Sequence, residues 1–316
     1  MNAVRHYIVR RLLGAVPVLL GISLLAFVLA QLSPGDPAEI MLEAAGTGMP
    51  SAEEVAALHS YLGLDQPAYV QYGLWLWRIL HGDGGISYHL GMPVFTVLLA
   101  RLPVTVMLAA ASLCWAAVGG IGLGLLMARM RGIWAAMLLH GVTQVMLATP
   151  SFLTAILLIL IFGVWLHVLP TNGVDAAAGY LLPSFALALV TLAMTAQLLD
   201  AQLREALASL YAQTARLRGL SEGRVLLTYA LPNALVPVMA MLGNFAAAVL
   251  GGAIIVETVF ALPGIGSLAL DAIHYRDYPL LQGYVLFLGS IYVLVTLAVD
   301  LVLARMDPRI VLGGGD

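Results

Sequence analysis

The chain has 316 residues, of which 61% are hydrophobic and only 10% carry a charged side chain. Soluble domains are about half apolar and a quarter charged, so this composition excludes an ordinary soluble fold and indicates a membrane protein. The formal net charge is −3, every basic residue other than histidine is arginine, and the single cysteine, Cys114, excludes a disulfide within one chain.

Apolar runs without charges are long enough to cross a bilayer as helices. The first run follows Arg10 and Arg11 and is longer than the core of a secretory signal, so we interpret it as a retained span; a cleaved signal is the alternative. The third run is too long for one straight crossing, and Gly141 and Pro150 predict a tilt, a kink or a partly interfacial start. Six spans are predicted, at 10–31, 103–128, 134–166, 180–199, 233–256 and 283–303.

The segment 32–102 connects the first two spans and contains two helical patterns. In the first, Ser51 and Glu54 form a capping-box pattern and Gly63 can end the helix. The second, 69–80, is rich in aromatic residues and suits a helix lying at the membrane surface. An ordinary packed external subdomain is the alternative for this second pattern.

Arginine distribution predicts the orientation, because arginines concentrate on the cytoplasmic side. With a cytoplasmic N-terminus, only Arg78, Arg101 and Arg276 fall outside, and the other 11 of the 14 arginines fall inside. Six spans then place both termini in the cytoplasm.

The internal segment 200–232 predicts a helix, a turn and a second helix. Gly219 fits a helix end with positive φ, Ser221 can cap the next helix, and Pro232 is expected to end it. Such an element is shaped to dock with a partner, although a solvated connector has the same pattern.

Several motifs in the chain resemble the permeases of ABC importers for peptides and nickel. The stretch 211–221 with 229–237 looks like the EAA loop by which these permeases contact their ATPase. Leu210 and Leu217 depart from it, since an acidic residue and an alanine are common there. The stretches 34–37, 62–67, 251–266, 276–279 and 306–310 resemble the same branch, and 69–77 with 215–220 looks most like the nickel permeases.

The resemblance implies an all-α, polytopic type I ABC importer permease in the bacterial inner membrane. It divides the chain into the first span (1–31), an external subdomain (32–102), a permease core (103–310) with the coupling loop 200–233, and a cytoplasmic tail (311–316). It implies that Gly219 permits a tight turn, Ala215 permits close approach, and Arg216 and Arg218 offer cationic contacts to the ATPase; topology signalling is the alternative for the arginines. The coupling residues are Tyr211, Thr214, Ala215, Arg216, Arg218, Gly219, Leu220 and Ser221.

The implied partners are a second, homologous permease chain, two cytoplasmic ATPase subunits, an external substrate-binding protein and membrane lipid, with no nucleic acid. The chain has no phosphate-binding loop, and it lacks the lysine that this loop requires, so it is not expected to be an enzyme. No cofactor is expected in this chain, and ATP and Mg²⁺ belong to the ATPase subunits. Nucleotide-driven closure would then rock the spans by alternating access.

The cargo is predicted less directly. A nickel species, bare or chelated, is the first interpretation, and di- or oligopeptides are the alternative. His140 and Gln144 lie one helical turn apart, but a lone histidine in a span more often bonds a neighbouring helix, so no metal site is predicted. Polar residues expected to line a pathway are Gln144, Thr149, Ser151, Thr195 and Asn244.

Two other classes of membrane protein are the alternatives to an importer permease. An intramembrane enzyme would need a nucleophile–base pair or paired acids, and a secondary transporter would need coupling carboxylates near the midplane or a repeated half. The sequence shows neither pattern, and both classes leave the internal helix pair unexplained.

Overall fold

The computed structural model describes residues 2–32, 35–44, 50–130, 133–171, 173 and 177–306, so the predicted tail 311–316 lies outside the described residues. Within these ranges the chain has no β-strand, and the predicted all-α class is confirmed. Five helical segments are long and apolar enough to cross a membrane, and a bent pair provides a sixth. The chain divides into two compact units, which are described separately below.

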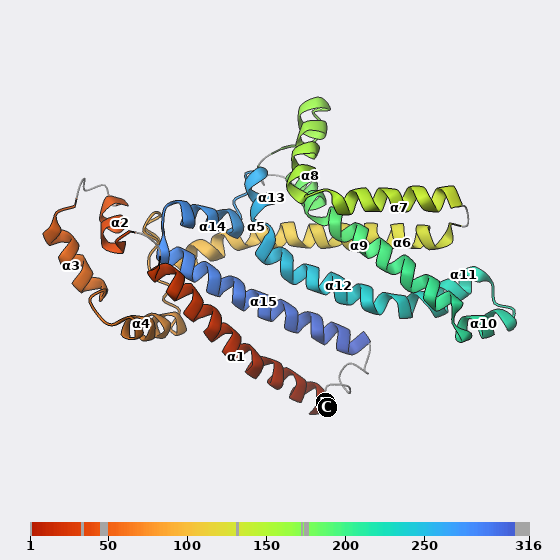
Figure 1. Ribbon diagram of the computed structural model, residues 1–316, viewed down its shortest axis with the longest axis horizontal. Coiled ribbons are helices and arrows are strands. Elements are labelled where there is room, and N and C mark those ends of the chain that lie inside the picture. The colour runs from red at the N-terminus through yellow and green to blue at the C-terminus, as the bar shows by residue number, and fades with distance from the viewer. Residues whose placement is uncertain are drawn as a thin grey trace. The chain divides into compact units, whose positions relative to one another are not determined.

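The first unit comprises Val106–Leu262 with the chain ends Met1–Tyr7 and Leu294–Asp316. Its centre is the long helix α9, which contacts α6, α7, α8 and α12 (Figure 1). Its elements are the second half of α5 (Val94–Cys114), η1 (Trp115–Gly119), α6 (Gly120–Arg129), α7 (Ile133–Ala148), α8 (Ser151–Leu158), η2 (Ile159–Trp165), η3 (Ala177–Tyr180), α9 (Leu181–Ala208), α10 (Leu210–Leu217), α11 (Glu222–Val225), η4 (Leu226–Ala230), α12 (Leu231–Gly252), α13 (Ile254–Val259) and the end of α15 (Tyr278–Met306).

Glycines allow α6 to approach α9 closely. A Cβ atom on Gly120 would lie 2.5 Å from Cβ of Thr195, and one on Gly124 would lie 2.8 Å from the backbone oxygen of Ala196. Gly122, on another side of α6, has open space where its Cβ would be. The small-x-x-x-small pair Gly120 and Gly124 therefore serves packing inside this chain.

The third apolar run is broken into α7 and α8. The two helices bend by 102° between Ala148 and Ser151. Figure 1 shows α7 and α8 running in clearly different directions. Pro150 has no N–H to donate and disfavours helical geometry at Thr149, and its own ψ of 145° is extended. The predicted kink is confirmed, and it is sharp enough to separate two helices.

The prediction that Pro232 ends a helix is wrong. Residues Glu222–Leu250 form one apolar helical segment, in which the π-helical turn η4 precedes Leu231 and Pro232. A π turn widens the hydrogen-bonding pattern, so a proline just after it can continue the helix.

Three other spanning helices are longer than predicted, at Val94–Arg129, Ala177–Ala208 and Tyr278–Arg305.

The second unit comprises Ile8–Thr105 and Pro263–Val293. Its core joins the start of α5 to α14 and to the start of α15 through Val94, Leu98, Ile265, Leu268 and Leu280, all of them buried. Besides parts of α5 and α15, it contains most of α1 (Asn2–Gln31), α2 (Pro37–Ala44), α3 (Ala52–Leu62), α4 (Ala68–Leu80) and α14 (Ile265–His274). Because α5 begins at Val94, the predicted boundary at 102 falls inside a helix.

The capping prediction for α3 is confirmed. The Glu54 amide donates to the Ser51 hydroxyl at 3.3 Å, and the Ser51 amide donates to the Glu54 carboxylate at 2.9 Å. The Ser51 hydroxyl also donates to this carboxylate at 2.9 Å, and the donations from the Ser51 amide and hydroxyl lower the pKa of Glu54. Gly63 ends the helix with φ 71°, as glycine permits.

Candidate functional site

The loop between α9 and α12 forms a compact helix pair. The α9 helix ends at Ala208, and Ser209 takes an extended conformation, with φ −69° and ψ 160°, before α10 begins. The Ser209 carbonyl accepts the Gln213 amide at 3.1 Å, which starts the new helix. Figure 1 shows α10 and α11 together at one end of α9, within the same unit.

One face of α10 packs inside this loop. Ala212 and Ala215 are buried against Val225 of α11, with Leu207 and Leu220 at the edge of the cluster. Ala215 is only 3% exposed, so its small side chain allows α11 to approach. The close approach that Ala215 permits in this structure is that of α11, because this side chain faces inward, and its role toward the ATPase stays a prediction.

The turn after α10 is a Schellman motif. The Gly219 amide donates to the Arg216 carbonyl at 2.9 Å, and the Leu220 amide donates to the Ala215 carbonyl at 3.3 Å. Gly219 has φ 83°, a left-handed conformation that costs other residues about 1–2 kcal/mol. The predicted tight turn at Gly219 is confirmed.

Arg216 connects α10 to the start of α11 and to the end of α9 by hydrogen bonds. Its Nε donates to Glu222 Oε1 at 2.8 Å, Nη2 donates to Oε2 at 3.3 Å, and Nη1 donates to the Leu207 carbonyl at 2.9 Å. Arg218, by contrast, is exposed. The two arginines thus differ, since Arg216 is engaged within the loop and Arg218 faces outward.

Ser221 lies at the N-cap of α11, but its side chain makes no cap hydrogen bond, so the predicted side-chain cap is wrong. Its carbonyl instead accepts the amides of Arg224 and Val225, both at 2.9 Å. Thr214 is exposed and donates from its hydroxyl to the Leu210 carbonyl at 2.9 Å.

The outward face of α10 is apolar at both ends. Leu210 is 79% exposed, Leu217 is 90% exposed, and Tyr211 lies partly exposed beside Leu210. Leucines this exposed on a loop that is otherwise braced and packed leave a surface that another protein can cover. Leu210 and Leu217 are also the two positions at which the sequence departs from the EAA pattern.

The residues predicted to line a pathway lie on several helices and differ in exposure. Gln144 on α7 and Asn244 on α12 are exposed, whereas Thr149 and Ser151 flank Pro150 at the break between α7 and α8. Thr195 is fully buried and donates to the Thr191 carbonyl of its own helix at 2.7 Å. Thr195 therefore cannot face a pathway, because it packs against Gly120.

A polar network that the sequence interpretation missed joins α7 to α9. The carboxylate of Asp200 is almost buried and accepts two hydrogen bonds from Arg204 Nε, at 2.9 and 3.0 Å. His140 Nε2 lies 3.6 Å from the same carboxylate, and Gln197 donates to Thr143 at 2.8 Å. The sequence feature that could have indicated this network is the spacing of four residues between Asp200 and Arg204, next to an apolar run.

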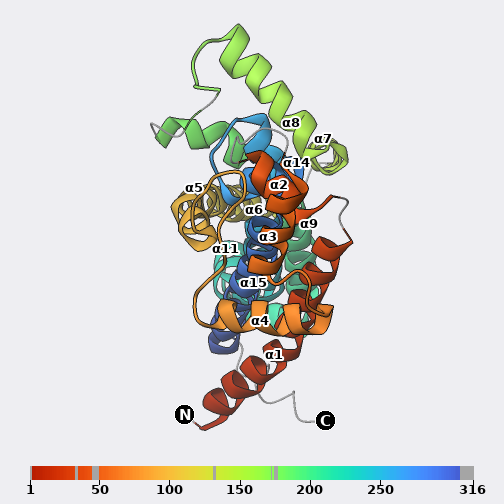
Figure 2. The same ribbon diagram turned by 90° about the vertical axis from the view of Figure 1, so that its left-hand side faces the viewer.

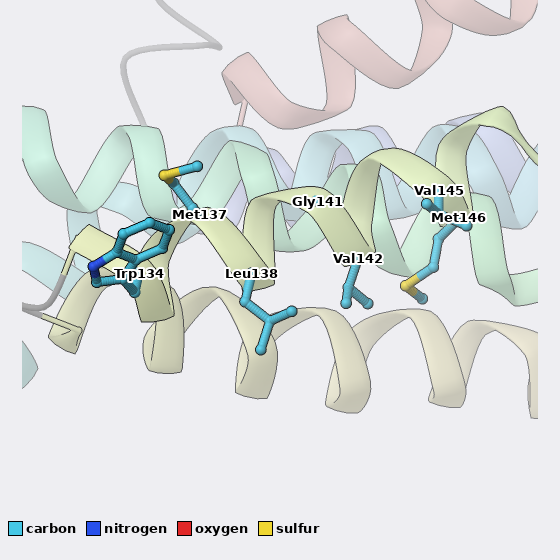
Figure 3. Close-up of a pocket in the computed structure, with 7 residues that line it drawn as sticks. All are labelled: Trp134, Met137, Leu138, Gly141, Val142, Val145 and Met146. Carbon is cyan, nitrogen blue, oxygen red and sulfur yellow. The ribbon is translucent and has the colours of Figure 1, made fainter.

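A groove on α7 has a volume of about 560 Å³ and is shown in Figure 3. No charged side chain is found among the described residues that line it, so it has no charge with which to hold a polar solute. Its lining residues are Trp134, Met137, Leu138, Gly141, Val142, Val145 and Met146. Among the described residues, no three histidine, cysteine, aspartate or glutamate side chains are grouped so that they could hold a metal ion.

Comparison with known proteins identifies the family. Residues 120–312 match the family described as binding-protein-dependent transport system inner membrane component, and residues 4–109 match the N-terminal family of such components. A Brucella suis biovar 1 (strain 1330) protein assigned to a peptide transport system as permease is 38% identical over 311 residues, covering 96% of this chain and 98% of the relative. The glutathione transport system permease protein GsiC of Escherichia coli (strain K12) is 35% identical over 305 residues, with the same coverage.

Solved structures show the same fold. The methionine ABC transporter MetNI in an inward-facing conformation aligns with a TM-score of 0.56 at 17% identity, covering 67% of this chain and 97% of that chain. An amino acid ABC transporter aligns with a TM-score of 0.50 at 18% identity, covering 68% of this chain and 94% of that chain. The chain therefore belongs to the family of binding-protein-dependent transport system inner membrane components, as a multi-pass permease subunit of an ABC importer whose ATP is hydrolysed on a separate subunit.

Proposed function

We propose that this permease carries short peptides, of two to several residues, into the cell. The observation that carries the proposal is similarity over nearly the whole chain to permeases named for a peptide and for glutathione, itself a tripeptide. These relatives favour the peptide alternative over the nickel species that the sequence interpretation put first. His140 lies near Asp200 and Arg204, an environment that differs from a metal site with several neutral histidines.

The exposed face of α10 is proposed to rest on an ATPase subunit. Leu210, Tyr211 and Leu217 supply apolar contact, and Arg218 supplies a cation at its edge. The Schellman turn at Gly219 and the Arg216–Glu222 pair make the loop stiff, so that movement of the ATPase is transmitted to α9 and α12 instead of being absorbed. The spans then alternate between inward- and outward-open states.

The proposed assembly contains two ATPase subunits that bind ATP and Mg²⁺, an external binding protein and a second permease chain. Gln144 and Asn244 are the best-placed predicted pathway residues, because both are exposed and uncharged polar side chains. Thr149 and Ser151 are proposed to contribute at the helix break. Amide and hydroxyl groups can exchange hydrogen bonds with peptide groups without holding them tightly.

The N-terminus is proposed to be cytoplasmic. We also propose that 1–31 holds the first span, that 32–102 is external, that 103–310 is the permease core and that 311–316 is a cytoplasmic tail. With Cys114 replaced by alanine, Ser221→Cys should resist an impermeant maleimide in intact cells, whereas Ala56→Cys on external α3 should react once the outer membrane is made permeable. The reverse pattern would invert the topology.

The cargo is tested by uptake into proteoliposomes that contain the complete transporter with its own ATPases and binding protein. We expect ATP-dependent accumulation of a radiolabelled dipeptide or of glutathione, with unlabelled peptide competing and nickel ions without effect. Uptake of nickel that peptides do not inhibit would contradict the peptide proposal and restore the metal interpretation.

A further inference from the structure

Helix α4 is attached to the first spanning helix, α1, by one of its faces. The aromatic ring of Tyr72 lies 5.4 Å from that of Phe27, and the ring of Trp75 lies 5.9 Å from Phe27, measured between centroids. Ser23 donates to its own helix at Leu20, so the Tyr72 hydroxyl is the donor in the 2.8 Å hydrogen bond between Tyr72 and Ser23.

The partners on α1 fix the depth of α4. Ser23, Phe27 and Gln31 follow one another at intervals of four residues on one face of α1, and Gln31 donates to Gln71 at 2.8 Å. The apolar span of α1 ends at Gln31, so Ser23 lies about 12 Å inside that end at 1.5 Å per residue. Helix α4 therefore lies beside the last part of the span, and Figure 2 shows it crossing α1.

The opposite face of α4 is uncovered and amphipathic. Tyr69 is 78% exposed, Trp77 is 64% exposed and Leu80 is 72% exposed, at spacings that place them on one side of a helix. Arg78 is exposed next to Trp77, where its guanidinium can reach a phosphate. Tyrosine, tryptophan and arginine together are typical of the layer between lipid headgroups and acyl chains.

We propose that the face of α4 formed by Tyr69, Trp77 and Leu80 binds lipid at the boundary between headgroups and acyl chains. Its position beside the span supports this, since a water-soluble partner does not enter the bilayer at that depth. Other sides of α1 are also apolar and uncovered, since Leu24, Leu25 and Leu29 are 50–60% exposed, as expected of a helix that crosses a membrane. α4 thereby returns the chain to a fixed depth beside α1 after α2 and α3.

Spin labels measure this depth in the assembled transporter. With Cys114 replaced by alanine, a label is placed at Trp77→Cys, at Tyr69→Cys and, as the control, at Ala56→Cys on the exposed surface of α3. Each variant is purified with its partner subunits into nanodiscs of phosphatidylcholine and phosphatidylglycerol. Collision rates are then recorded with oxygen, which concentrates in lipid, and with a water-soluble nickel chelate.

The proposal predicts that labels at 77 and 69 collide with oxygen several-fold more than with the nickel chelate, and that the label at 56 shows the reverse ratio. Labels at 77 and 69 that respond like position 56 would place α4 in water. Low collision rates with both reagents would mean that protein covers this face. Either result overturns the proposal, whereas peptide uptake by the same variants reports separately on the transporter's function.

Discussion

At the scale of single residues, Asp277 connects the segment between α4 and α5 to the last spanning helix. It is fully buried and accepts hydrogen bonds from the Ser87 hydroxyl at 2.5 Å, from the His89 amide at 3.2 Å and from the Leu280 amide at 3.2 Å. The last of these caps the start of α15. Burial, together with the negative charge of Asp277, also raises the pKa of the Tyr88 phenol to about 12.

Replacing Asp277 with asparagine should destabilise the transporter by about 2–4 kcal/mol, because the new amide group must face one of three hydrogen-bond donors. The thermal unfolding midpoint of the purified assembly measures the loss. Asp271→Asn on the exposed side of α14 serves as the matched control and should leave the midpoint unchanged. Equal midpoints for the two variants would show that Asp277 has no such role.

The structural role of a residue was predictable from the sequence where that role depends only on its neighbours in the chain. The Ser51–Glu54 capping box and the turn at Gly219 depend on backbone geometry within a few residues. Asp277 could not be assigned this way, because its partner Ser87 is 190 positions away in the chain. The inward direction of Ala215 likewise depends on how α10 packs on α11.

At the scale of helices, the contact between α6 and α9 depends on particular glycines. Gly124→Ala would place a Cβ atom 2.8 Å from the Ala196 carbonyl oxygen, which belongs to the backbone and cannot rotate away. We expect a loss of about 1–3 kcal/mol, measured as a lower unfolding midpoint of the assembly. Gly122→Ala is the control, since its Cβ atom would meet open space.

The result that would contradict this account of the α6–α9 contact is a Gly124→Ala protein as stable as Gly122→Ala.

The spans themselves were predictable from apolar runs, and so was the kink at Pro150. The spans were predicted to be shorter than they are, because helices such as α9 continue past the apolar run through Asp200 and Arg204 to Ala208. Hydropathy could not reveal that η4 lets the helix continue through Pro232.

At the scale of the whole molecule, the chain is a permease subunit of an ABC importer whose ATP is hydrolysed on a separate subunit, and we propose that its spans move with that ATPase. The class of protein was predictable because the sequence carries the relevant motifs from end to end. The cargo was not predictable, since the remaining pathway candidates carry amide and hydroxyl side chains and none of them specifies a solute by charge. The aromatic motif that suggested nickel lies largely on α4, which we assign to lipid contact.

The most direct test is peptide-stimulated ATP hydrolysis by the complete reconstituted transporter carrying Leu217→Asp. This side chain is 90% exposed, so the substitution should leave the fold intact while placing a charge in the proposed contact with the ATPase. The control is Tyr61→Asp on α3, where the original side chain is 84% exposed. We predict that Leu217→Asp lowers the stimulation about tenfold, equivalent to about 1.4 kcal/mol, and that Tyr61→Asp keeps it. Full stimulation in an assembled Leu217→Asp transporter would contradict the coupling role of α10.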